Sequence, residues 1–244
     1  MNSNQGNQKL KVEVWSDIMC PFCYIGKRNY EMALSKFEHA DDIQIVWKSF
    51  QLDPTLPETS SENVYEYLAK RKGLGLEQVK QLHENVTNTA KIAGLEYNFD
   101  KTQISNSFKA HQLIQLAKSK NLGDEAEEVL FYAYFTEGKN LSDISTLVEL
   151  GQKISLDEFE IRSILENKTF EKNVHQEIEE AQQIGVRGVP FFVFDRKYAV
   201  SGAQPVDSFY STLVQAHKEW VEKKNITSLS VNNEGESCDV NENC

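Results

Sequence analysis

The chain has 244 residues, of which 26 are basic and 37 acidic, so its net charge is −11. This negative surplus disfavours phosphate backbones and anionic headgroups, and we expect neither nucleic acid nor a membrane as a partner. The longest apolar runs, such as 189–194, are far shorter than the roughly 20 residues of a membrane-spanning helix. The polar first eight residues lack the features of a secretion signal, which predicts a cytoplasmic protein. Four cysteines are too few for a disulfide scaffold there, so catalysis, metal binding or inertness remain for them.

The first elements surround a cysteine pair. Residues 11–16 alternate with the two-residue period of a half-buried strand, and Cys20-Pro21-Phe22-Cys23 follows within a few residues. From Pro21 to Phe37 the apolar spacing predicts an amphipathic helix, with proline tolerated in its first turn. Residues 43–50 then predict a second strand, so the segment is typical of a parallel strand-helix-strand unit.

A break at residues 53–57 separates this unit from a long helical region that extends to about Lys168. Strand character returns at residues 189–194 and 198–201, and Pro205 opens a final helix that ends near Lys224. The predicted fold class is α/β (α+β), a thioredoxin-like fold interrupted by an all-helical insertion. We expect a thioredoxin-like domain at 10–57 and 169–224, a helical insertion at 58–168, and a flexible C-terminal tail with a second cysteine pair at 225–244.

The spacing of Cys20 and Cys23 favours dithiol chemistry. The positive end of the helix dipole favours a thiolate at Cys20, which predicts that Cys20 is the nucleophile. Cys23, one turn further on, is placed to attack the mixed disulfide and release the substrate. Such a mechanism requires no cofactor and no metal. Two alternatives stay open, namely that the pair is buried and inert or that it is half of a zinc site.

The second predicted site element is the segment 185–190, where two glycines and Pro190 precede a strand. We expect the Val189-Pro190 bond to be cis and to face both cysteines, leaving the Val189 backbone free to pair with an extended substrate. A trans edge proline is the alternative. Arg187 has two interpretations, a solvated arginine in a loop or a group that steers anions such as the carboxylates of glutathione. We favour the first.

Together three motifs resemble the DsbA-family thiol oxidoreductases of the FrnE-like group. They are Ser16-Asp17-Ile18-Met19-Cys20-Pro21-Phe22-Cys23-Tyr24-Ile25-Gly26, Gly185-Val186-Arg187-Gly188-Val189-Pro190-Phe191-Phe192-Val193, and Val200-Ser201-Gly202-Ala203-Gln204. The resemblance implies a thioredoxin fold with a helical insertion, Cys20 as nucleophile, Cys23 as resolving thiol and Pro190 as the cis-proline. Related 2-hydroxychromene-2-carboxylate isomerases and kappa-class glutathione transferases carry serine where Cys20 stands, which favours dithiol chemistry here.

The favoured function is therefore a thiol-disulfide oxidoreductase or isomerase that acts on protein or low-molecular-weight thiols and disulfides, with glutathione as one candidate. One alternative is a glutathione-dependent transferase or isomerase of small hydrophobic compounds. Another is a chaperone or binding module whose surface would be an aromatic group, although these side chains fit a core better: Phe131, Tyr132, Tyr134 and Phe135.

The C-terminal cysteines and the histidines are the remaining candidates. Cys238 and Cys244 suggest an auxiliary redox pair that exchanges with the active-site disulfide, with incidental thiols in a tail as the alternative. A zinc site would instead gather all four cysteines. The histidines, at 39, 83, 111, 175 and 217, are scattered singly and fit surface or packed positions, and His111 is the one that an insertion beside the redox pair would offer to a substrate cleft.

Overall fold

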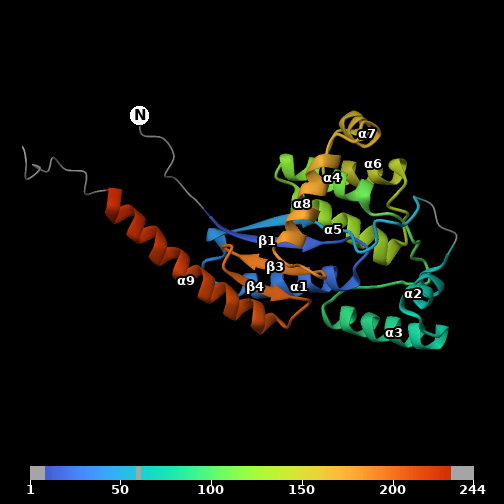
Figure 1. Cartoon of the computed structure of the whole chain (residues 1–244), viewed down its shortest axis with the longest axis horizontal. Helices are drawn as coiled ribbons and strands as arrows, with labels where there is room; N and C mark the ends of the chain where they lie inside the picture. The colour runs from blue at the N-terminus through green and yellow to red at the C-terminus, as the bar shows by residue number, and fades with distance from the viewer. Residues whose placement is uncertain (1–8, 59–61, 232–244) are drawn as a thin grey trace, which may run out of the picture.

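The structure, a computed structural model, describes residues 9–58 and 62–231. Its four-stranded sheet has the order β2-β1-β3-β4. The strand β1 (Leu10–Ser16) pairs in parallel with the edge strand β2 (Ile43–Ser49), as predicted. The strands β3 (Phe191–Phe194) and β4 (Tyr198–Ser201) form an antiparallel hairpin, and β3 also runs antiparallel to β1. Residues from opposite ends of the sequence therefore lie side by side in the middle of the sheet (Figure 1).

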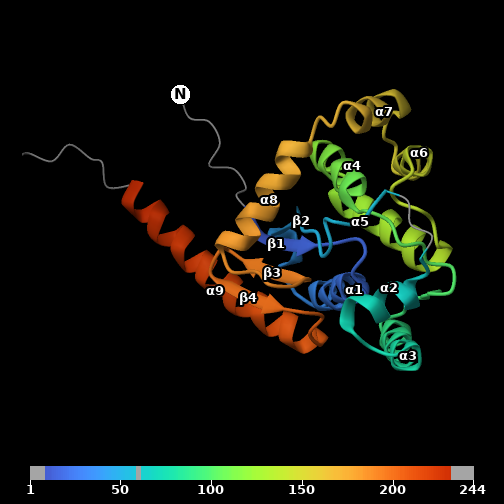
Figure 2. The ribbon, with the colours of Figure 1, turned by 45° about the vertical axis from the view of Figure 1, so that its right-hand side comes forward.

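Helices cover both faces of this sheet. The alternation of side chains along β1 and β3 directs Val12, Val14, Phe192 and Phe194 toward α1 (Pro21–Ser35) and α9 (Val206–Val231). Trp15 and Val193 point to the other face, where they pack with Ala181 of α8 (Glu171–Gln183). Figure 2 shows α9 along one side of the sheet and α8 along the other.

The segment between β2 and α8 is helical, as the sequence predicted. In chain order this segment contains α2 (Val64–Lys72), α3 (Leu76–Ile92), α4 (Phe108–Ser119), α5 (Gly123–Tyr132), a π-helical turn (Ala133–Glu137), α6 (Ile144–Lys153) and α7 (Glu158–Glu166). A short 3-10 turn, Ala40–Asp42, lies before β2. A single apolar cluster fills the space among these helices, and it also contains Ile18, Cys20, Cys23 and Tyr24. The cysteine pair is thus packed into the core of the inserted helices.

Several element boundaries differ from the prediction, two of them for a clear physical reason. The last helix continues to Val231 rather than ending near Lys224, because neither glycine nor proline interrupts residues 225–231. Strand β3 begins at Phe191 rather than Val189, since Pro190 has no N–H to donate to a ladder. Within the described residues, no helix combines the length and hydropathy that a bilayer crossing requires.

Candidate active site at the cysteine pair

Cys20 lies at the N-terminal end of α1, as predicted. It is the N-cap residue, with extended backbone angles (φ −90°, ψ 111°), and Pro21 follows as the first helical residue. The turn that joins β1 to this position is closed by a hydrogen bond from the Cys20 N–H to the Asp17 carbonyl oxygen at 2.9 Å. One Asp17 carboxylate oxygen accepts from the Met19 N–H at 3.2 Å, so Asp17 shapes the turn. The sulfur of Cys20 therefore lies where the unpaired N–H groups of the helix begin.

Cys23 is one turn further along α1 and has no exposed surface. Its N–H donates to the Cys20 carbonyl oxygen at 3.0 Å. Burial raises the pKa of the Cys23 thiol well above its ordinary value, and the neighbouring Cys20 raises it further. The Asp17 backbone N–H and the Ser16 hydroxyl oppose this by stabilising the thiolate. Both thiols are buried, Cys20 with 4% of its surface exposed and Cys23 with none.

The segment before β3 lies against Cys20, one of the two cysteines that it was predicted to face. The Val189-Pro190 peptide bond is cis, and the Cys20 sulfur lies 3.4 Å from the Val189 carbonyl oxygen. The Pro190 carbonyl oxygen accepts from the Gly202 N–H at 2.8 Å, which joins this loop to the end of β4. A Cβ atom on Gly26 would come within 2.9 Å of the Pro190 ring. Glycine at position 26 therefore allows α1 to pack closely against the proline.

Three contacts to the cysteine turn come from residues beyond β2. The second Asp17 carboxylate oxygen accepts from the Leu52 N–H at 2.7 Å. The Tyr97 hydroxyl, from the segment after α3, donates to the Pro21 carbonyl oxygen at 2.6 Å. His111 of α4 places its Nε2 3.6 Å from Asp17 and is 1% exposed, so it is packed behind the turn rather than open to a substrate cleft.

A buried carboxyl group lies behind Cys23 that the sequence analysis did not identify. Glu127 of α5 is 1% exposed, and one of its oxygens accepts from the Ser16 hydroxyl at 3.4 Å. Burial raises the pKa of Glu127 to about 8, with Lys27 acting in the opposite direction. One feature of the sequence indicates this burial. Glu127 precedes Leu130 by three residues and Phe131 by four, which places all three on one face of a helix.

An ionic network joins α1 to α5 beside this carboxyl group. Lys27 of α1 is 1% exposed, and its ammonium lies 3.3 Å from Asp124 and 3.2 Å from Glu128, with Glu31 as a further partner. The Trp47 indole N–H donates to Asp124 at 2.9 Å, which adds β2 to the network. The helix that carries both cysteines is therefore fixed to the inserted helices by charge as well as by apolar packing.

The surface next to Cys20 is apolar. Phe22, between the two cysteines, is 44% exposed, and Met19 and Val189 are half-buried. Arg187 is exposed, in line with a loop arginine. The aromatic group that the chaperone alternative requires is largely core, since Phe131, Tyr134 and Phe135 are buried and Tyr132 alone is half exposed.

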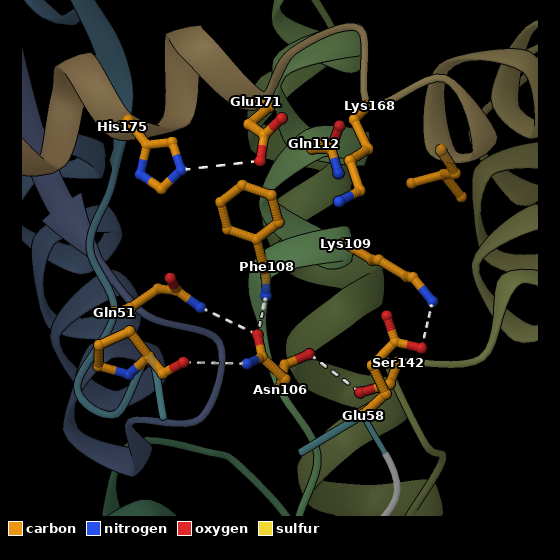
Figure 3. A pocket seen from close by; sticks show the side chains of 12 residues that line it. Gln51, Glu58, Asn106, Phe108, Lys109, Gln112, Ser142, Lys168, Glu171 and His175 are labelled. Carbon is orange, nitrogen blue, oxygen red and sulfur yellow. Dashed lines mark hydrogen bonds and ion pairs between the residues drawn. The ribbon is translucent and has the colours of Figure 1, made fainter. Parts of the chain in front are cut away.

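A separate pocket of about 290 Å³ opens between the segment after β2 and helices α4, α7 and α8 (Figure 3). Phe108 lies near its centre beside His175, with ring centroids 5.2 Å apart. Its charged groups are largely matched within the pocket, because Lys109 pairs with Glu58 at 2.9 Å and His175 lies 4.0 Å from Glu171. Neither cysteine lines this pocket, so it is not the redox site.

Metal ligands do not gather around the cysteine pair in the part of the chain that the structure describes. There, the one cluster of three or more potential ligands is His39, Asp42 and His217, and it includes neither cysteine. Cys238 and Cys244, the expected auxiliary pair, lie outside the described residues, so the four-thiolate zinc interpretation remains untested.

Comparisons with known proteins agree with this arrangement. Residues 11–214 match the family model described as DSBA-like thioredoxin domain. A probable DsbA oxidoreductase from Streptomyces coelicolor is 36% identical, with a TM-score of 0.82 over 86% of this chain and 91% of its own. The uncharacterized protein YwbO of Bacillus subtilis is 26% identical over 85% of this chain and 98% of its own length.

One further likeness concerns the fold alone. The cytosolic disulfide reductase DsbM of Pseudomonas aeruginosa is 14% identical, with a TM-score of 0.61 over 86% of this chain and 99% of its own. The overall fold is thus shared with both of these solved structures. The chain belongs to the DSBA-like thioredoxin domain family.

Proposed function

We propose that the protein is a thiol-disulfide oxidoreductase or isomerase in which Cys20 is the nucleophile and Cys23 the resolving thiol. The observation that carries this proposal is the asymmetry of the pair. Cys20 caps a helix and lies 3.4 Å from the Val189 carbonyl oxygen, whereas Cys23 is fully buried with a raised thiol pKa. In this proposal the thiol at the helix N-terminus, where the helix dipole favours a thiolate, attacks first, and the fully buried thiol acts second.

The reaction balances as two thiol-disulfide exchanges. The Cys20 thiolate attacks one sulfur of a substrate disulfide, which forms a mixed disulfide and releases the other half as a thiolate. Cys23 then loses its proton and attacks the Cys20 sulfur, which closes the Cys20-Cys23 disulfide and releases the second substrate thiolate. The substrate gains two electrons and the protein loses two. A thiol reductant such as glutathione restores the dithiol and is itself oxidised to its disulfide.

Ser16 and Glu127 supply a route for the Cys23 proton. The Ser16 hydroxyl contacts both the Cys23 sulfur and the Glu127 carboxyl group. A pKa of about 8 allows that carboxyl group to exchange protons close to neutral pH. In this proposal Ser16 and Glu127 are positioning and proton-exchange residues, because neither touches the substrate.

Substrate binding is assigned to Val189 and Pro190. The loop lies directly against Cys20, Val189 is half-buried, and Phe22, next but one to Cys20 in the chain, is exposed. An extended substrate segment can pair with backbone groups here as an added strand does at a sheet edge. Protein disulfides and glutathione disulfides are both substrates of this class; one DsbM structure contains GSH, which favours glutathione as a reductant.

A compartment with a reducing glutathione pool, such as the cytoplasm, would keep the pair reduced, so reductase or isomerase work is favoured over bulk oxidation. The test uses reduction of insulin by the full chain with dithiothreitol. Cys20→Ser is expected to abolish turnover, and Cys23→Ser to accumulate a mixed disulfide on Cys20 that mass spectrometry detects.

Two outcomes would contradict the proposal. Turnover that survives Cys20→Ser would exclude Cys20 as the nucleophile. Activity that requires glutathione, acts on small electrophiles and survives Cys23→Ser would instead indicate a glutathione transferase or isomerase. The exposed His175→Ala variant, outside the site, serves as the control for handling and fold.

A further inference from the structure

A cluster of metal-ligating side chains lies away from the cysteine pair. His39 and Asp42 belong to the short connection between α1 and β2, and His217 belongs to α9. One nitrogen from each histidine and one Asp42 oxygen all lie within 4.8 Å of one another. Sequence patterns could not predict this cluster, because the two histidines are separated by 178 positions, from 39 to 217.

Packing fixes one histidine and the aspartate. The His217 ring is 7% exposed and has an edge contact to Phe37, with centroids 5.4 Å apart, and a tilted contact to Trp220 at 5.6 Å. Its Nε2 lies 2.9 Å from an Asp42 carboxylate oxygen. Two of the three ligands are thus held together by contacts that do not depend on an ion.

The third ligand can adjust. His39 is exposed, and its ring stacks on His217 with centroids 4.4 Å apart and planes 12° apart. Ligand atoms around a tetrahedral zinc ion lie about 3.4 Å apart, for metal-ligand distances near 2.1 Å. His39 is the exposed member of the cluster, so its side chain has room to move toward that spacing, and the 2.9 Å distance between Asp42 and His217 would lengthen as an ion enters.

The surroundings suit a cation. The cluster borders a surface hollow of about 550 Å³ whose lining includes Glu38 and Glu222 as well as Lys218. Water from this hollow can take a fourth position. Two imidazole nitrogens with one carboxylate oxygen form a ligand set for Zn²⁺ and similar transition metals, whereas Mg²⁺ and Ca²⁺ prefer oxygen alone.

We propose that His39, Asp42 and His217 form a site for a divalent transition metal, with Zn²⁺ as the reference ion. Where the His217 Nε2 carries the proton shared with Asp42, the ion replaces that proton and releases it to solvent. The bound ion joins the α1-β2 connection to α9. It acts as a clamp on the fold and takes no part in the exchange of disulfides.

The test measures Zn²⁺ binding by calorimetry and by thermal unfolding. It uses the full chain without an affinity tag and with all four cysteines replaced by serine, so that thiolates cannot bind the ion. We expect one Zn²⁺ per chain, no response to Mg²⁺, and a rise in Tm of about 5 °C at a zinc concentration a hundred times the dissociation constant.

Variants locate the site. His39→Ala and Asp42→Asn change exposed or half-buried side chains and are each expected to weaken binding by about tenfold or more, the range for the loss of one metal contact. His175→Ala, an exposed histidine outside the cluster, should bind as the parent does. Absence of binding at submillimolar zinc, or binding that His39→Ala and Asp42→Asn both leave intact, would overturn the proposal. In a second experiment His39→Ala is made in the chain that keeps its four cysteines, and its rate of insulin reduction should equal that of the wild type. A negative result in the zinc test is therefore distinct from a failure of the proposed function.

Discussion

Replacing Glu127 with glutamine is expected to remove a large part of the pH dependence of stability. Glu127 is buried, and its pKa of about 8 in the folded state compares with 4.5 for an ordinary glutamate. At pH values between 4.5 and about 8, the Glu127 carboxyl group is ionised in the unfolded chain and protonated in the folded chain. Because the unfolded state then binds fewer protons, the free energy of unfolding falls as pH rises from 4.5 to 8.

The size of the effect follows from the shifted pKa. At 1.36 kcal/mol for each pH unit, the full rise from 4.5 to about 8 corresponds to about 5 kcal/mol. Between pH 5.5 and 7.5 the expected loss is about 3 kcal/mol, taken as the difference between the wild type and the variant so that the other titrating groups cancel. The glutamine side chain keeps the shape and an acceptor for the Ser16 hydroxyl but does not ionise, so the variant should lack this loss.

The assay is urea unfolding of the reduced protein at pH 5.5, 6.5 and 7.5, followed by circular dichroism. The wild type should lose stability along this series relative to Glu127→Gln, with equal slopes of free energy against urea in both chains. Glu125→Gln, an exposed position on the same helix, is the matched control and should behave as the wild type does. Parallel pH profiles for the wild type and Glu127→Gln would refute the reasoning.

Three further predictions concern the turn, its surface and the tail. Phe22→Ser removes a ring that is 44% exposed and close to Cys20 in the chain. It should lower kcat/KM for insulin by about tenfold and leave kcat/KM for a small disulfide unchanged. The control Phe159→Ser, at an 83% exposed position on α7, should change neither value. In Asp17→Asn an amide NH₂ must face either the Met19 or the Leu52 N–H, so one of these hydrogen bonds is lost. The free energy of unfolding in urea should fall by about 1 to 3 kcal/mol. A fall below about 0.5 kcal/mol would show that other groups can replace the lost bond. Joint replacement of Cys238 and Cys244 by serine should lower turnover with dithiothreitol and shift the redox potential of the Cys20-Cys23 couple, and unchanged values of both would remove the proposed auxiliary pair.

Local sequence patterns were enough for the elements that hold the cysteines. The alternation along β1 and the apolar spacing after Pro21 both concern neighbours within one or two turns, and the structure has the strand and the helix there. The parallel pairing of β1 with β2 also followed, because a strand-helix-strand segment of this length permits few arrangements. The cis bond before Phe191 was predicted from its context of glycines and a following strand.

The supporting shell of the site was beyond sequence reasoning for a physical reason. Glu127 contacts Ser16 across 111 positions, and Tyr97 contacts Pro21 across 76. No local pattern encodes which buried helix face meets which turn, since that depends on how the inserted helices pack. The same applies to His39 and His217, which appear isolated along the chain and are stacked in the fold.

The order of strands has a consequence for synthesis on the ribosome. Val12 of β1 pairs with Phe194 of β3, which is translated 182 residues later. At about 5 to 20 residues per second, the emerging chain waits about 10 to 40 s for that strand. During this interval one edge of β1 has no partner and Cys20 has no Val189 carbonyl beside it. For most of its translation a nascent chain therefore has Cys20 but lacks the loop that completes the site around it. The unpaired edge of β1 is the surface that chaperones would cover during this period.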